Sequence, residues 1–344
     1  MDPTSIKAIA VESRQAERDA AAARRRPIGW LGRILRVREM FLVIILLLII
    51  IVMSAFDPGF RSAANVRATL LGFSMEAMVA IGMTMLLVSG GFDLSVGANM
   101  ALAGMVTAQA LKFGVPVVPC VLAGLAVGTA AGLLNAWVVA KVGVNALIAT
   151  LGTMTIVRGI ALTIWAGQPV INLPEEFRGM GQGVVGGIFP VPFIILIVLT
   201  AVFDILMRRG RWFRQLYFVG GSDKAARLSG INVTRIRIIT YVAAGLLAGL
   251  AGVVSTSRLG AGYPNSYDPT ALRVISGAVI GGCSLFGGEG SVVGSVMGVL
   301  FIAMLLDIMV LRGVSPYAQG IVQGVALILA VVVDIWTKRQ AARG

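Results

Sequence analysis

Residues 208–237 read RRGRWFRQLYFVGGSDKAARLSGINVTRIR, a polar stretch between two apolar runs that are each long enough to cross a bilayer. Short loops that are rich in Lys and Arg remain on the cytoplasmic side of a membrane. This stretch is therefore expected to face the cytoplasm. It decides both the class of fold, a polytopic membrane protein, and the orientation of that fold.

A short helix is predicted inside this stretch. Gly220 and Gly221 are expected to form a turn, Ser222 or Asp223 to cap the helix, and Gly230 to close it. Either the segment is a solvated loop that only sets orientation, or it is a small knob that docks into a groove on a soluble partner.

The predicted helix has two faces of different character. One face is apolar and the other is expected to be solvated: Ala225, Ala226 and Leu228 against Asp223, Lys224 and Arg227.

Composition supports a chain that lies mostly in lipid. Apolar residues make up 57% and charged residues 13% of the 344 residues, and the mean hydropathy is +0.90. The formal net charge is +13, and most of the Lys and Arg residues fall in the segments expected on the cytoplasmic side. The positive charge therefore indicates the orientation of the chain in the membrane, and nucleic-acid binding is not expected. With no histidine and two cysteines inside apolar segments, the chain lacks the residues for His-ligated zinc or haem and for Ser-His or Cys-His nucleophiles.

The pattern of apolar runs predicts an all-α fold of about ten transmembrane helices, with broken or re-entrant segments at 90–97 and 281–290. Cytoplasmic basic tails at 1–38 and 338–344 would flank a transmembrane domain at 39–337. With ten spans, both tails and the stretch 208–237 would lie on the cytoplasmic side. The ten expected spans are 40–56, 69–88, 99–113, 116–141, 145–166, 191–207, 235–257, 270–285, 291–311 and 316–336.

Several polar residues lie within or beside these spans. A charged side chain deep in a span costs about 2.5–3.5 kcal/mol on insertion scales, so such residues are expected to face protein or water. Asp93 and Ser95 either form a capped turn at the membrane edge or line the solute route. Arg158 either forms hydrogen bonds to backbone carbonyls or contacts the solute. The candidate route residues are Glu76, Asp93, Ser95, Asn99, Asn145, Arg158 and Asp307.

Two glycine blocks share a pattern. Gly90-Gly91-x-x-Leu94 and Gly281-Gly282-x-x-Leu285 are each followed by a Ser-Val start to a helix rich in small residues. Two explanations are open. The blocks are an internal repeat, as in the duplicated halves of many transporters, or they arise by chance among the 43 glycines of the chain.

Four blocks, in order, carry a resemblance to a known family. They are GMTMLLVSGGFDLSVG (82–97), IATLGTMTIVRGIAL (148–162), YFVGGSDKAARLSGINVTRIRIITYVAAGLLAGLAGV (217–253) and AVIGGCSLFGGEGSVVGSVMGVL (278–300). Together they resemble the permease subunits of sugar-type ATP-binding-cassette importers, over roughly residues 65–336. The resemblance implies a fold like that of type II importers in the inner membrane of a bacterium.

The resemblance also implies a function and partners. A separate ATPase subunit would bind ATP and push on the cytoplasmic segment, a periplasmic solute-binding protein would deliver the solute, and a second permease copy or paralogue would complete the pathway. Consistent with this, the chain contains no G-x-x-x-x-G-K-[ST] phosphate loop, so this chain needs no cofactor of its own. The implied coupling residues are Gly220, Gly221, Ser222, Asp223, Lys224, Ala225, Ala226, Arg227, Leu228, Gly230 and Ile231.

The substrate class implied by the resemblance is a pentose, a hexose or a polyol, because sugar-type members share the Asp93-Leu94-Ser95 block. A branched-chain amino acid permease and an ATP-independent secondary carrier remain alternatives. The sequence differs from the family pattern at Ala271-Leu272-Arg273, where family members commonly have Glu-Leu-Asp. The reversed charge, expected at the outer mouth, suggests an acidic or phosphorylated sugar.

Overall fold

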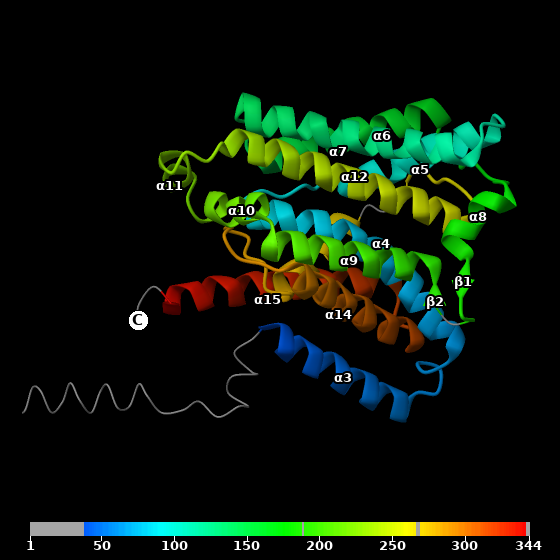
Figure 1. Ribbon diagram of the computed structural model, residues 1–344. Helices are drawn as coiled ribbons and strands as arrows, with labels where there is room; N and C mark the ends of the chain where they lie inside the picture. Colours follow the sequence, from blue (N-terminus) through cyan, green and yellow to red (C-terminus); the bar gives the residue numbers. More distant parts are fainter. Residues whose placement is uncertain (1–37, 188, 266–268, 342–344) are drawn as a thin grey trace, which may run out of the picture.

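The fold is a bundle of long helices (Figure 1). The computed structural model describes residues 38–187, 189–265 and 269–341, so most of the two predicted tails lies outside the described residues. The helices of the bundle are α3 (Arg38–Phe56), α4 (Ala63–Val88), α5 (Val96–Lys112), α6 (Val117–Ala136) with the π-helical η1 (Trp137–Val142), α7 (Ala146–Trp165), α9 (Val191–Arg209), α12 (Val233–Leu259), α13 (Thr270–Ile280), α14 (Val292–Leu311) and α15 (Pro316–Ala341).

A helix lies in each of the ten expected ranges, but the helices are not all long enough to cross a bilayer. In the described residues seven are long and apolar enough: α4, α6 with η1, α7, α9, α12, α14 and α15. The apolar parts of α3 and α13 are shorter, and α5 has 17 residues. The range 270–285 was predicted too long, because α13 ends at Ile280 and the chain then turns through a glycine-rich segment.

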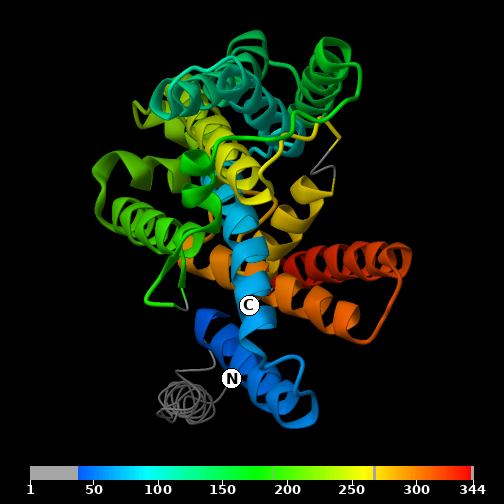
Figure 2. The ribbon, with the colours of Figure 1, turned by 90° about the vertical axis from the view of Figure 1, so that its right-hand side faces the viewer.

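Helix α4 runs through the middle of the bundle (Figure 2) and packs against α9, α12, α13 and α14. Its residues from Phe73 to Val88 are buried, apart from a partly exposed Glu76. Apolar side chains from α4, α12 and α13 meet there and form the largest core cluster. The element that sequence treats as one span among ten is therefore the axis of the fold.

Helices α6 and α12 approach closely along a line of glycines. A Cβ added to Gly128 would lie 2.6 Å from the Cα of Gly249, and one added to Gly132 would lie 3.0 Å from the Cα of Gly245. Backbones can approach this closely only where side chains are absent. The glycines that recur every four residues in α6 therefore serve its close packing against α12.

The two ends of the bundle carry different elements. Helices α10 (Arg211–Gly221) and α11 (Asp223–Leu228) lie at one end, which we call the α11 end. Helix α8 (Glu175–Gln182) and the hairpin of β1 (Val184–Val185) and β2 (Phe189–Pro190) lie at the other, the α8 end. The segment between α7 and α9 is thus partly regular. The Ser257 hydroxyl of α12 holds it by hydrogen bonds to the backbone of α8 at Phe177 and Gly181.

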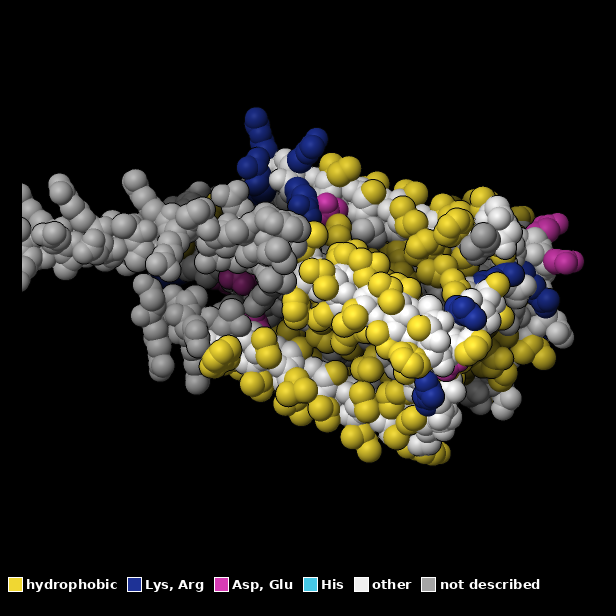
Figure 3. All heavy atoms as spheres, turned by 90° about the horizontal axis from the view of Figure 1, so that it is seen from below, with side chains coloured by type: hydrophobic (Ala, Val, Ile, Leu, Met, Phe, Trp, Pro, Cys, Tyr) yellow, Lys and Arg dark blue, Asp and Glu magenta, His cyan; other side chains and the backbone are white. Residues whose placement is uncertain are grey.

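The outer surface matches a bundle that is embedded in lipid. On the face in Figure 3, hydrophobic side chains fill the middle and Lys and Arg side chains gather toward both ends. Large apolar side chains on α3, α7 and α15 are exposed, among them Ile51, Ile164 and Ile321. Such a surface is stable in a bilayer and would aggregate in water.

Substitution in the glycine line should destabilise the bundle. We expect Gly128→Ala to lower the unfolding temperature of the detergent-solubilised protein, since overpacking of a tight contact typically costs about 1–3 kcal/mol. Gly179→Ala in α8 is the matched control, because an added Cβ there meets no described atom within 4 Å. Equal unfolding temperatures for the two variants would contradict the close α6–α12 contact.

Candidate functional site

Helix α11 is a short capped helix that stands at the end of the molecule. The Ser222 hydroxyl accepts a hydrogen bond from the Ala225 N–H at 3.3 Å. Gly230 has φ +79°, and the N–H groups of Gly230 and Ile231 each donate at 3.0 Å to carbonyls in the last turn of the helix. This pattern is the Schellman ending that favours glycine. The predicted Ser222 cap and glycine stop are confirmed.

The apolar residues of α11 do not share one face, as the sequence suggested. Ala226 is only 2% exposed and packs into the main core, whereas Leu228 is 87% exposed and Ala225 is exposed. Lys224 and Arg227 are exposed beside them. The outward surface of α11 is therefore one large apolar side chain, Leu228, flanked by two positive charges.

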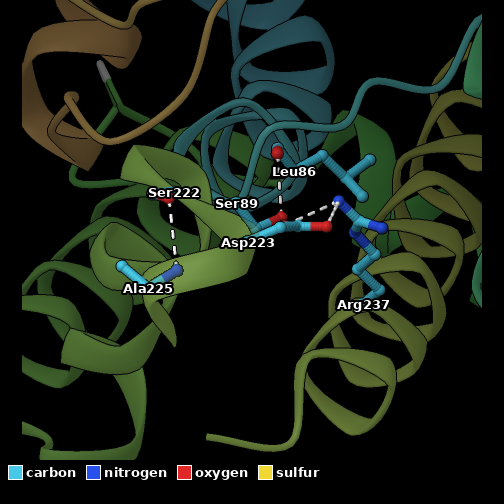
Figure 4. Close-up of polar contacts among 6 residues, drawn as sticks. All are labelled: Leu86, Ser89, Ser222, Asp223, Ala225 and Arg237. Carbon is cyan, nitrogen blue, oxygen red and sulfur yellow. Dashed lines mark hydrogen bonds and ion pairs between the residues drawn. The ribbon is translucent and has the colours of Figure 1, made fainter. Parts of the chain in front are cut away.

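Asp223 was expected to be solvated but is paired. Its two carboxylate oxygens accept hydrogen bonds from the Arg237 Nη2 atom at 2.9 and 2.8 Å (Figure 4). Arg237 lies in the second turn of α12, so the pair ties α11 to the start of a long helix that runs through the bundle. Both side chains are partly exposed, so the ion pair positions α11 more than it stabilises the fold.

Gly220 and Gly221 do not form the predicted turn, because they are the last two residues of α10. Gly220 serves close packing. A Cβ on it would overlap the Val88 carbonyl oxygen and would lie 2.5 Å from the Gly288 nitrogen. A Cβ on Gly221 would meet no described atom within 4 Å.

Gly220 is thus part of a contact between three backbones, which we call the backbone junction. The end of α10 meets the end of α4 at Val88 and the turn 281–291 at Gly287 and Gly288. The Gly288 N–H donates to the Val88 carbonyl at 2.9 Å, and the Tyr217 hydroxyl of α10 donates to the Gly290 carbonyl at 3.0 Å. The polar stretch is therefore locked to two elements inside the bundle.

A recess of about 440 Å³ also opens at the α11 end. It is lined by the turn after α4, by the turn before α7 and by Arg237 and Tyr241 of α12. Asn145 lines the recess and caps α7, because its Oδ1 accepts from the Leu147 N–H at 2.8 Å.

Asp93 is fully buried in the turn between α4 and α5. Its Oδ1 accepts from the backbone N–H and the hydroxyl of Ser95, at 2.8 and 2.6 Å, and its Oδ2 accepts from Asn135 of α6 at 3.0 Å. Burial raises the pKa of Asp93, and these hydrogen bonds act against that rise. This geometry matches a structural turn, one of the two interpretations open for Asp93 and Ser95. The bond from Asn135 also holds the turn against α6.

Asn99, also proposed for the route, lies inside the helix packing. Its Nδ2 donates to the carbonyls of Gly128 on α6 and Gly245 on α12, at 3.1 and 3.3 Å. Asn99 is fully buried, so in this structure it joins three helices and does not face a route.

Glu76 of α4 pairs with Arg273 of α13, with 2.8 Å between Oε1 and Nη1. Glu76 lies near the middle of α4, so Arg273 lies inside the bundle and not at the outer mouth, where the sequence placed it. The pairing cancels the positive charge of Arg273. The suggestion of an acidic or phosphorylated solute therefore loses its basis.

The remaining candidates lie apart from one another. Asp307 of α14 accepts a hydrogen bond from Asn65 of α4 at 2.8 Å, near the α8 end. Arg158 is partly exposed on α7. The seven candidates therefore do not form one cluster, and within the described residues no group of three or more Cys, Asp or Glu side chains is placed to hold a metal ion.

Sequence reasoning missed the partners that give these residues their functions. These partners are Asn135, Arg237 and Tyr217. They lie within apolar or basic stretches of the sequence, and no motif or spacing there distinguishes them from their neighbours. The glycine blocks 90–91 and 281–282 do lie at equivalent helix ends, but the positive φ falls on Gly90 in one and on Gly282 in the other. The two blocks thus differ in which of their two glycines takes the positive φ.

Comparison with known proteins identifies the family. The family described as "Branched-chain amino acid transport system / permease component" matches residues 65–331. The ribose import permease protein of Bacillus subtilis is 36% identical over 86% of this chain and 90% of its own length. That of Escherichia coli K12 is 38% identical, over 82% and 89% respectively.

A relative with another sugar in its name is equally similar. The L-arabinose transport system permease protein of Escherichia coli K12 is 37% identical over 88% of this chain and 92% of its own length. No solved structure matches. The chain therefore belongs to this family of transport-system permease components.

Proposed function

We propose that this chain is the membrane-spanning permease subunit of an ATP-binding-cassette importer that carries a sugar, most simply a pentose, across the inner membrane of a bacterium. The observation that carries the proposal is the identity of 36–38% with ribose and arabinose permeases over more than four fifths of the chain. The family description also covers branched-chain amino acid permeases. The names of the relatives favour a sugar.

Ten membrane crossings, as in type II importers, agree with the chain path. If α3, α5 and α13 count as crossings or part-crossings, the chain alternates between the α11 end and the α8 end throughout. Positive charge favours the α11 end as the cytoplasmic one. Its basic residues include Lys141, Arg208, Arg209, Arg211, Arg214, Lys224, Arg227, Arg235 and Arg237, against Arg61, Arg67, Lys112, Arg178, Arg258 and Arg312 at the α8 end.

A separate ATPase subunit would dock on α11. Leu228 offers an apolar side chain that is otherwise left in water, with Lys224 and Arg227 beside it, and the recess next to α11 widens the surface. Closure of the ATPase on ATP would displace α11 and α10 together. The Asp223–Arg237 pair and the backbone junction would pass that displacement to α12, to α4 and to the turn 281–291. The two permeases would then alternate between outward and inward access.

A second permease copy, or a related subunit, would cover the side formed by α7, α5, α13 and α15. In this row α5 packs against α7 and α13, and α13 packs against α15. Exposed glycines with open space around them lie on the two outer helices, Gly152 and Gly159 on α7 and Gly320 and Gly324 on α15. Glycine on an exposed membrane helix favours contact with another helix. Arg158, on α7, is then close to the solute route between the copies.

The solute-binding protein would dock at the α8 end. Glu175 and Glu176 are exposed in the first turn of α8 and offer a negative charge to a basic surface on that partner. A secondary carrier would leave the ordered α11 and its junction without a function.

Docking on α11 is tested by reversing its surface character. We expect Leu228→Asp to lower ATP-dependent sugar uptake at least tenfold and to reduce co-purification of the ATPase, because the apolar contact is lost. The amount of protein in the membrane should not change, since Leu228 packs little against the rest of the chain. Lys112→Glu, an exposed charge reversal at the α8 end, is the control; loss of co-purification in both variants, or in neither, would contradict the proposal.

The orientation is tested by labelling from each side. Single cysteines at Leu228 and at Glu175 should react with a membrane-impermeant maleimide only from the cytoplasm and only from the outside, respectively. The two native cysteines are buried, so they should contribute little background. Reaction of the Leu228 position in intact spheroplasts would place α11 outside and overturn the proposed topology.

A further inference from the structure

The Glu76–Arg273 ion pair lies deep in the membrane region. Glu76 follows Ala63 by thirteen residues and precedes Val88 by twelve, so it is about 20 Å and about 18 Å from the two ends of α4 at 1.5 Å per residue. Arg273 is the fourth residue of α13, which therefore begins near the same depth. Charged groups at such a depth are expensive in lipid and mark solute or ion pathways.

The pair has an open side. The side chain of Glu76 is 15% exposed and that of Arg273 is 23% exposed, whereas the next residue of α4, Ala77, is fully buried. Hydrocarbon cannot cover exposed charged atoms at this depth without a large cost, so the open side faces water or another protein surface. Arg273 lies on α13, which packs against both α5 and α15.

The pair also has hydrogen-bonding capacity to spare. The Arg273 Nη1 atom lies 2.8 Å from the Glu76 Oε1 atom, and the buried Arg273 Nε has no hydrogen-bond partner in the described part of the chain. A guanidinium has five N–H donors, and a carboxylate accepts about four hydrogen bonds. Together they offer donors and acceptors side by side, which is the combination that vicinal hydroxyl groups of a sugar require.

The backbone before α13 points to the same place. Helix α13 has only 11 residues, and the described residues just before it, 260–265 and 269, are non-helical. Irregular backbone at membrane depth is tolerated where it is buried in protein or lines a cavity, and broken helices of transporters hold their substrates near the midplane.

We propose that Glu76 and Arg273 form a hydroxyl-binding subsite for the sugar at mid-depth of the route between the two permeases. This inference rests on the proposed sugar-importer function. Arg273 donates to hydroxyl oxygens, and Glu76 accepts from hydroxyl protons while it keeps Arg273 in place. Charge neutrality of the pair suits an uncharged sugar that must leave again, because a lone charge would bind counter-ions instead.

The subsite is tested by thiol labelling of the assembled importer in membrane vesicles. In Arg273→Cys, 2-aminoethyl methanethiosulfonate should react and restore a cationic side chain opposite Glu76, which raises sugar uptake above that of the unlabelled variant. D-ribose or L-arabinose, with the solute-binding protein present, should slow the labelling at least tenfold. Ala77→Cys, at a fully buried neighbouring position, should remain unlabelled.

A second variant guards against a folding defect. Glu76→Cys treated with 2-sulfonatoethyl methanethiosulfonate restores a negative charge opposite Arg273 and should show the same protection by sugar. Labelling of either variant only after denaturation, or labelling that neither sugar slows while wild-type protein transports that sugar, would overturn the subsite. A wild-type importer that carries neither sugar would instead refute the proposed substrate class, which is a separate readout from labelling.

Discussion

The backbone junction is the constraint on which the rest of the structure depends. The α11 end carries the basic stretch 208–237, and Gly220 brings that stretch into direct contact with Val88 and Gly288. Backbone atoms in van der Waals contact leave no compressible side chain between the elements, so a displacement of one must move the others. Through this contact a surface helix is joined to the central helix α4 and to the turn that follows α13.

The polar residues inside the bundle fall into two groups with different physical functions. Asp93, Asn99 and their partners are buried and satisfy backbone and side-chain groups where helices begin or cross. Glu76 and Arg273 instead pair across two helices and retain exposed atoms. Because α13 leads into the turn of the backbone junction at one end and carries Arg273 near the other, the same short helix joins the α11 end of the bundle to the middle of α4, where Glu76 lies.

Sequence alone predicted the helical membrane fold, the approximate position of each helix and the Ser222 and Gly230 ends of α11. These features depend on local chemistry: apolar run length, capping side chains and glycine at positive φ. It could not predict that Gly220 serves packing, that Asp223 binds Arg237 or that Arg273 meets Glu76. Those contacts join residues that are far apart in the chain, and their partners are set by tertiary packing that no local pattern encodes. The length of α13 was missed for a similar reason, because the apolar run continues past Ile280 into an irregular turn.

The central claim is that the backbone junction transmits work from ATP hydrolysis on another subunit to the bundle. Measuring ATP hydrolysis and sugar uptake together, in vesicles with the ATPase and the binding protein, tests it most directly in Gly220→Ala and Gly221→Ala. The account predicts that Gly220→Ala retains hydrolysis but loses uptake at least tenfold, because its Cβ separates the three backbones. Gly221→Ala, whose Cβ meets open space among the described atoms, should behave like the wild type. Unchanged uptake in Gly220→Ala would contradict the account.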